Sequence, residues 1–134
     1  MDRYQLRRWI DAYERAWRTP GTDALEQLFS ARATYQTAPF ERPHEGLAAI
    51  ARMWEAEREG PDEVFAMDSE IVAVEGELGV VRVEVRYGDP VTQTYRDLWI
   101  VAFDGERRCR SFEEWPFWPP SSDGRIAGTR ETLG

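Results

Sequence analysis

The second half of the sequence alternates apolar and polar side chains, and this pattern constrains the fold more than any other feature. Between residues 81 and 87 the apolar positions are Val81, Val83, Val85 and Tyr87 and the charged ones are Arg82, Glu84 and Arg86. Successive side chains of a strand point to opposite faces, so the segment is predicted to be a strand buried on one side. Residues 64–76 are its expected hairpin partner, and residues 92–104 and 107–118 form a second predicted hairpin. Four successive strands indicate a mostly antiparallel sheet.

The first half has a helical period instead. Apolar residues recur about every 3.6 positions over residues 3–18, which predicts an amphipathic helix with Leu6, Trp9, Ile10, Tyr13 and Trp17 inward. Asp23 and Glu26 have the spacing of a capping box, which predicts a short second helix with Leu25, Leu28 and Phe29 inward. Residues 45–59 form the third predicted helix, with Leu47, Ile50 and Trp54 inward.

One strand is expected before the third helix. Residues 33–40 mix β-branched and aromatic side chains and contain Pro39, which indicates a short edge strand because proline cannot donate to a ladder. Three helices on one face of this sheet define an α+β fold. We expect a single domain over residues 1–118 and a polar C-terminal tail over 119–134.

Charge and composition exclude several classes of protein. The net charge of −8 argues against a nucleic-acid partner, because such binding rests on basic side chains that neutralise phosphates. No apolar run approaches the length of a membrane span and no signal peptide is evident, so we expect a cytoplasmic protein without a membrane partner. Cys109 and His44 are the only residues of their types, which excludes a structural zinc site, and we predict no metal.

The last hairpin places carboxylates among aromatic side chains. With a three-residue loop at 104–106, Asp97 faces Glu113 and Tyr95 faces Trp115, while Phe112 joins Leu98 and Ile100 on the outer face. A two-residue loop, or a bulge near Phe112, would instead bring Glu114 inward. Both glutamates therefore stay candidates.

Asp97 has two interpretations. In the first, Asp97 and a glutamate line an aromatic pocket, where desolvation and the nearby like charge raise a carboxyl pKa toward neutrality. In the second, Asp97 pairs with an arginine and the glutamates are solvated. Aspartate is depleted inside strands, and Asp97 lies in an apolar run between Tyr95 and Trp99, which favours the first interpretation.

The order of helices and strands, with the segments APFERPHEGLAAI and DGERRCRSFEEWPFW, resembles the nuclear transport factor 2-like superfamily, especially its SnoaL-like branch. The resemblance covers roughly residues 3–118. It implies a cone-shaped domain in which a curved, mostly antiparallel sheet wraps three N-terminal helices, and a homodimer formed through the outer sheet face. Members include ketosteroid isomerases, limonene epoxide hydrolases, scytalone dehydratases and polyketide cyclases. In such enzymes an Asp, His or Tyr on the cavity-facing strands is the acid or base, a role open here to Asp97, Glu113 or Glu114.

Further side chains are candidates for lining a substrate pocket. Tyrosine hydroxyls could orient a carbonyl, His44 could act as a base at the pocket mouth or cap the third helix, and each aromatic residue could equally be ordinary core. The candidate substrate-binding residues are Tyr13, Trp17, Tyr35, Thr37, His44, Trp54, Tyr95, Trp99 and Trp115.

Three hypotheses follow for the function. The first is a cofactor-independent enzyme that acts on a small apolar molecule by proton transfer: isomerisation, cyclisation, dehydration or epoxide opening. The second is a protein of the same shape that binds a hydrophobic ligand without chemistry. The third is a dimeric accessory module, which predicts a cavity filled by side chains. A buried Asp97 without an arginine partner would favour the first.

Overall fold

Three helices cover one face of a curved six-stranded sheet in the computed structural model, which describes residues 1–58 and 64–120. The helices are α1 (Arg3–Arg18), α2 (Leu25–Leu28) and α3 (Leu47–Glu57). The strands are β1 (Phe29–Gln36), β2 (His44–Glu45), β3 (Phe65–Glu75), β4 (Leu78–Tyr87), β5 (Gln93–Phe103) and β6 (Cys109–Phe117). The α+β fold expected from the sequence is confirmed. No helix in the described ranges is long and apolar enough to span a membrane.

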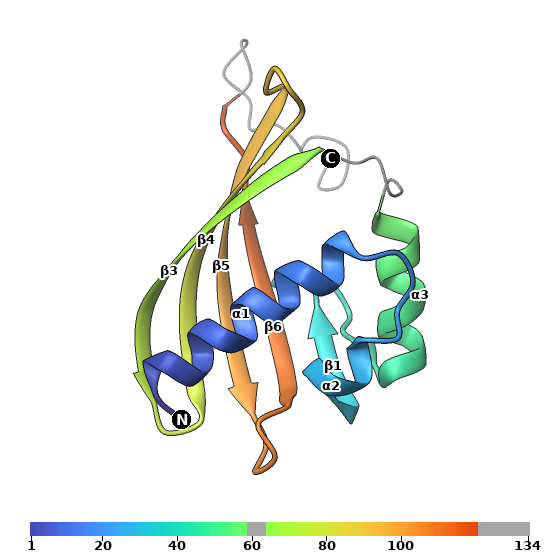
Figure 1. Cartoon of the computed structure of the whole chain (residues 1–134), viewed down its shortest axis with the longest axis vertical. Coiled ribbons are helices and arrows are strands. Elements are labelled where there is room, and N and C mark those ends of the chain that lie inside the picture. The colour runs from blue at the N-terminus through green and yellow to red at the C-terminus, as the bar shows by residue number, and fades with distance from the viewer. Residues whose placement is uncertain (59–63, 121–134) are drawn as a thin grey trace.

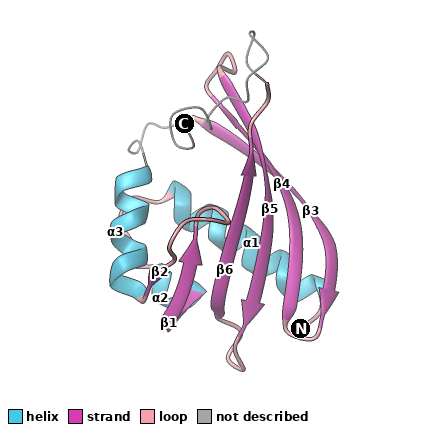
Figure 2. Cartoon of the chain, turned by 180° about the vertical axis from the view of Figure 1, so that it is seen from behind, coloured by secondary structure: helices cyan, strands magenta, loops and turns pink. Residues whose placement is uncertain are grey.

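The sheet has the strand order β2-β1-β6-β5-β4-β3. Strands β3 to β6 form the predicted meander, in which each strand is antiparallel to the next. The early strand β1 joins the meander beside β6 in the parallel direction. Figure 1 shows α1 crossing the concave face of the sheet while α3 stands beside β1, and Figure 2 shows the opposite face without a helix over it.

Helix α1 begins with a capping box at Asp2, whose carboxylate accepts a hydrogen bond from the backbone N–H of Gln5 at 2.8 Å while the Gln5 side chain accepts one from the Asp2 N–H. Its apolar stripe packs on the sheet so closely that a Cβ atom at Gly79 would lie 2.6 Å from Leu6 Cδ2. The helix spans residues 3–18, as the periodicity predicted.

The second helix and first strand differ from prediction. The residue before α2 is Ala24, and no side chain caps the helix, so the predicted capping box at Asp23 and Glu26 is wrong. Phe29 opens β1 instead of closing the helix, because it pairs with Cys109 of β6. Such a contact between distant residues cannot be read from local spacing. The strand ends at Gln36, before Pro39.

The register predicted first for the last hairpin, with a three-residue loop at 104–106, is also wrong. Phe103 pairs with Cys109 and Ala102 with Ser111, which leaves Arg110 as an extra residue on β6. The loop is longer than expected because the Asp104 side chain organises it: Oδ1 accepts hydrogen bonds from the backbone N–H groups of Glu106 and Arg108. Asp97 consequently pairs with Pro116 rather than Glu113.

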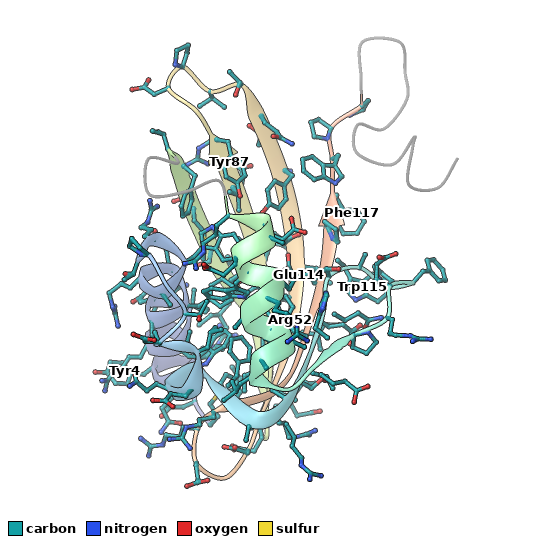
Figure 3. The ribbon with its side chains drawn as sticks, turned by 90° about the vertical axis from the view of Figure 1, so that its right-hand side faces the viewer. Tyr4, Arg52, Tyr87, Glu114, Trp115 and Phe117 are labelled. Carbon is teal, nitrogen blue, oxygen red and sulfur yellow. The ribbon has the colours of Figure 1, made fainter. Side chains whose placement is uncertain are left out.

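The extra residue moves the following side chains of β6 to the opposite face of the sheet. A bulge that brings Glu114 inward was the alternative predicted for this hairpin. Phe112, predicted on the outer face, is 1% exposed and stacks on Tyr13 with ring centroids 5.5 Å apart. Glu114 faces the helices and Glu113 faces away from them, and Figure 3 shows Glu114 and Trp115 on opposite sides of β6. The outer face still carries Leu98 and Ile100, and the homodimer expected there stays a prediction.

Candidate functional site

A cavity of about 290 Å³ lies between the helices and the inner face of the sheet. Its walls come from α1, α3 and five of the strands, so residues far apart in the sequence meet there. They are Tyr13, Trp17, Tyr35, Thr37, Met53, Glu57, Phe65, Met67, Val85, Tyr87, Tyr95, Asp97, Trp99 and Glu114. The cavity is open and largely aromatic, with two carboxyl groups on its inner wall.

Asp97 is the most deeply buried acidic residue of this wall, with 3% of its surface exposed. Its Oδ2 accepts a hydrogen bond from Trp99 Nε1 at 3.3 Å. Its Oδ1 is buried and accepts no hydrogen bond from any N–H or hydroxyl group within the described ranges. An unsatisfied buried oxygen is costly unless a proton or a ligand reaches it.

Glu114 stands next to Asp97 on the same face, because Trp99 pairs with Glu114 across β5 and β6. Tyr35 donates a hydrogen bond from its hydroxyl to Glu114 Oε1 at 2.9 Å. The hydroxyl oxygens of Tyr13 and Tyr35 are 2.5 Å apart. A hydroxyl has one proton to donate, so with Tyr35 bound to Glu114 it is Tyr13 that donates to Tyr35. The two tyrosines and Glu114 therefore form one directed chain.

The two carboxyl groups interact strongly. Burial raises the pKa of Glu114 well above its usual value, and the negative charge of Asp97 raises it further. Burial also raises the pKa of Asp97, although hydrogen bonds from Glu114 and Trp99 partly offset this effect. Both shifts disfavour two ionised carboxyl groups side by side, so they favour a state in which the pair holds one proton.

Burial dominates the pKa values of the neighbouring tyrosines as well. It raises the pKa of Tyr13 and of Tyr35, and the charge of Glu114 adds to both shifts. Burial likewise raises the pKa of Tyr95, with a further contribution from Asp97. All three phenols are therefore neutral hydrogen-bond donors at ordinary pH.

Among the described residues, no arginine forms an ion pair with either of the two carboxyl groups. The arginines of β4 and β5 that could have paired with Asp97 lie on the outer face, where Arg82 binds Glu70 at 2.6 Å and Arg96 binds Glu84 at 3.0 Å. Within the described part of the chain Asp97 has no ion pair. Asp97 and Glu114 therefore line an aromatic pocket, as in the first of the two interpretations of Asp97. Asp97 is buried, its pKa is raised, and it has no ion pair with a described residue.

The structure brings most of the predicted site residues together and leaves four outside the cavity. Glu113 accepts a hydrogen bond from Trp115 Nε1 at 2.7 Å on the outer face. His44 lies in β2, paired with Tyr35 along the backbone. Trp54 packs behind the cavity, edge-on to Tyr13 at 5.2 Å. No group of three or more metal-ligating side chains occurs within residues 1–58 and 64–120.

Six cavity residues were not predicted: Met53, Glu57, Phe65, Met67, Val85 and Tyr87. For Val85 and Tyr87 the signal was present, since the alternation already placed them on the inward face of their strand. Met53 and Glu57 lie on the side of α3 that faces the opening, which the narrow stripe of Leu47, Ile50 and Trp54 did not indicate.

The family model of the SnoaL-like domain matches residues 6–109, most of the chain. The chain therefore belongs to the SnoaL-like family. No curated protein matches its sequence.

Three solved structures are similar in fold. A SnoaL-like protein from Agrobacterium tumefaciens, provisionally assigned as an isomerase, has a TM-score of 0.63 and 21% identity over 84% of this chain and 97% of its own. A protein of unknown function with a cystatin-like fold from Methylobium petroleophilum has a TM-score of 0.70 and 14% identity, covering 99% and 92%. A nuclear transport factor 2-like protein of unknown function from Mesorhizobium loti has a TM-score of 0.65 and 18% identity, covering 87% and 94%. These neighbours support the cone-shaped fold.

Proposed function

We propose that this protein is an acid–base enzyme that moves a proton on a small, largely apolar molecule. The observation that carries the proposal is the pair formed by the buried Asp97 and the partly buried Glu114, which face an open aromatic cavity lined, among the described residues, by no arginine. Two adjacent carboxyl groups in one desolvated site hold an acid and a base ready at the same pH. A carboxylate kept only for stability would be expected to have a cationic partner.

The proposed step is balanced by the pair itself. Asp97, as the ionised member, takes a proton from a carbon or hydroxyl of the substrate, while the protonated Glu114 gives its proton to another substrate atom. The pair ends with one proton, as it began. Tyr13 and Tyr35 lie in line behind Glu114 and hold its carboxyl group in place. An isomerisation of a carbonyl compound requires such an exchange, and cyclisation or dehydration uses the same two roles.

The experiment that tests this function detects proton transfer without knowing the natural substrate. Cyclic ketones and enones, one at a time, are incubated with the protein in D₂O, and replacement of C–H by C–D next to the carbonyl is followed by NMR. We expect exchange above the buffer rate with the unaltered protein, and a loss of about 100-fold or more in Asp97→Asn and in Glu114→Gln, the range typical of general acid–base groups. Glu113→Gln is the matched control on the outer face and should exchange normally.

A second function, ligand binding without chemistry, is favoured by one observation. The hydroxyl and carboxyl groups from Tyr13 to Glu114 already satisfy one another, so the network is complete without a reacting molecule. Ketones that bind, as detected by tryptophan fluorescence, but show no exchange would support this function against the first. The accessory module predicted a filled cavity, and the open cavity gives that hypothesis no support.

A further inference from the structure

Among the described residues, the cavity that holds the carboxyl pair is lined by acidic side chains and by no basic one. Glu57 joins Asp97 and Glu114 on its wall. The chain has 17 basic residues besides its histidine, all of them arginine, yet none of the arginines in the described ranges lines the cavity. A cleft lined by charges of one sign and by low-dielectric walls concentrates the electric field inside it.

Glu57 lies at the last residue of α3, where the unpaired carbonyl groups of a helix end add to the negative potential. Within the described residues its carboxylate has no ion pair or hydrogen bond. Its neighbour Glu55 differs, because it forms an ion pair with Arg58. The charge of Glu57 also contributes to the raised pKa of Glu114, so the field of Glu57 reaches the carboxyl pair.

Two arginines that contact cavity-lining residues, Arg18 at Phe65 and Arg58 at Trp17, are already engaged. Arg18 binds Glu14 at 2.8 Å and donates a hydrogen bond to the backbone oxygen of Phe65. Arg58 donates hydrogen bonds to the backbone oxygens of Thr19 and Gly21 as well as to Glu55. Neither is a free partner for an acidic ligand.

The aromatic walls complete a site for a cation. Tyr87 and Tyr95 stack with ring centroids 6.0 Å apart, and Phe65 lies 5.8 Å from Tyr87 on the same side. Figure 3 shows Tyr87 and Glu114 on the helix-facing side of the sheet. The faces of aromatic rings attract ammonium and guanidinium groups, as Arg18 already shows by lying 3.9 Å from the centroid of the Phe65 ring.

We propose that the ligand of this cavity is an apolar molecule of one or two rings that carries an amine. Its ring system lies against Trp99, Met53 and Val85, and its ammonium group lies toward Glu57 and the tyrosine faces. The volume of about 290 Å³ limits the body to this size. Molecules with a carboxylate or phosphate are excluded, because none of the described lining residues is a cation that could replace the water such groups lose. The proposal rests on the proposed function, since it names the substrate class of the same site.

Three probes that share a ring system and differ in charge test the proposal: 1-naphthylmethylamine, 1-naphthalenemethanol and 1-naphthoate. Isothermal titration calorimetry at neutral pH measures the affinity of each. We expect the amine to bind at least 10-fold more tightly than the alcohol, and the carboxylate to bind more weakly than both. Glu57→Gln should reduce the affinity for the amine several-fold and leave that for the alcohol unchanged. Glu55→Gln, which removes a paired carboxylate from the same helix, is the matched control and should leave all three affinities unchanged.

Several results would overturn the inference. The inference is wrong if the carboxylate binds as tightly as the amine. It is also wrong if the amine and the alcohol bind equally, or if no probe binds. If Glu57→Gln leaves the preference for the amine unaltered, Glu57 is not the residue that binds the ammonium group. The deuterium exchange of ketones is a separate measurement: exchange without amine preference leaves the enzyme function standing, whereas amine preference without exchange leaves a binding protein for amines.

Discussion

The two faces of the same sheet treat their carboxylates in opposite ways. On the outer face, Asp68, Glu70 and Glu84 all pair with arginines of β4 and β5 at 3.0 Å or less. On the inner face, Asp97 and Glu114 face aromatic rings and each other, with no arginine among the described residues that line the cavity. Alternation along the strands produces this separation, because neighbouring residues point to different environments.

The difference shows that environment, rather than residue type, sets the charge of these acids. Hydrogen bonds from Arg96 and Arg86 lower the pKa of Glu84, while burial raises that of Glu114. Both are glutamates in adjoining parts of one sheet. On the outer face arginines favour the ionised form of the acids, and on the inner face burial favours a protonated one.

The largest expected effect tests which face each residue of β6 occupies. Phe112→Ala removes a ring that is 1% exposed and should lower the free energy of unfolding by about 3–5 kcal/mol, because it leaves a cavity in the aromatic core. Phe117→Ala, at a position that is 59% exposed, is the matched control and should change it by less than about 0.5 kcal/mol. Urea unfolding followed by tryptophan fluorescence measures both. Equal, small effects would mean that the predicted three-residue loop is correct after all and the register described above is not.

An intermediate effect concerns stability against pH. The pKa of Glu114 is higher in the folded than in the unfolded chain, so the folded state binds more protons between the two values and stability falls as pH rises from about 4.3 through the folded pKa. Glu114→Gln removes this contribution, and its stability relative to the unaltered protein should increase from acid to neutral pH. Chemical unfolding at a series of pH values measures the difference. A constant difference would show that Glu114 titrates alike in both states.

The loop of the last hairpin, which Asp104 organises, should show the opposite trend in acid. Burial is slight at Asp104, and hydrogen bonds from Ser30 and the loop lower its pKa, so its stabilising contribution is present above the unfolded pKa near 3.9 and is lost as pH falls through the folded value. Asp104→Asn should therefore lose stability at neutral pH and approach the unaltered protein in strong acid. A variant whose deficit grows on acidification would contradict this account.

The smallest effect is expected for an exposed ion pair. Glu70→Gln breaks the ion pair with Arg82. The Arg82 side chain is 61% exposed and that of Glu70 is 67% exposed, so the loss of unfolding free energy should be at most about 1 kcal/mol. The cost should disappear in 1 M salt, where exposed charges are screened. Thermal unfolding at low and high salt measures it. A larger, salt-independent loss would mean that the outer face depends on buried electrostatics as the inner face does.

Much of the fold was predictable because it depends on local periodicity. The period of 3.6 gave α1, and the period of two gave the meander from β3 to β6. The place of β1 beside β6 depends on the pairing of Phe29 with Cys109, which are far apart in the sequence. The register of the last hairpin depends on the side chain of Asp104, and no apolar pattern indicates its hydrogen bonds.

The candidate site was predictable in part for the same reason. Asp97 was identified because it interrupts an apolar strand, and that position is buried in the structure. The choice between Glu113 and Glu114 depended on one extra residue in β6, so both had to be kept. Glu57 reaches the cavity from the end of a helix, where periodicity is least informative.

The central claim is that Asp97 and Glu114 share one proton beside the cavity, and carbon-13 NMR of the labelled side-chain carboxyl groups tests it most directly. The signal of Glu114 is assigned because it disappears in Glu114→Gln. It should keep the chemical shift of a protonated acid at a pH where Glu84 is fully ionised. Asp97→Asn should then lower the pKa of Glu114, because the charge of Asp97 helps to raise it. If Glu114 ionises together with Glu84, and Asp97→Asn leaves its titration unchanged, the pair holds no shared proton and the account is contradicted.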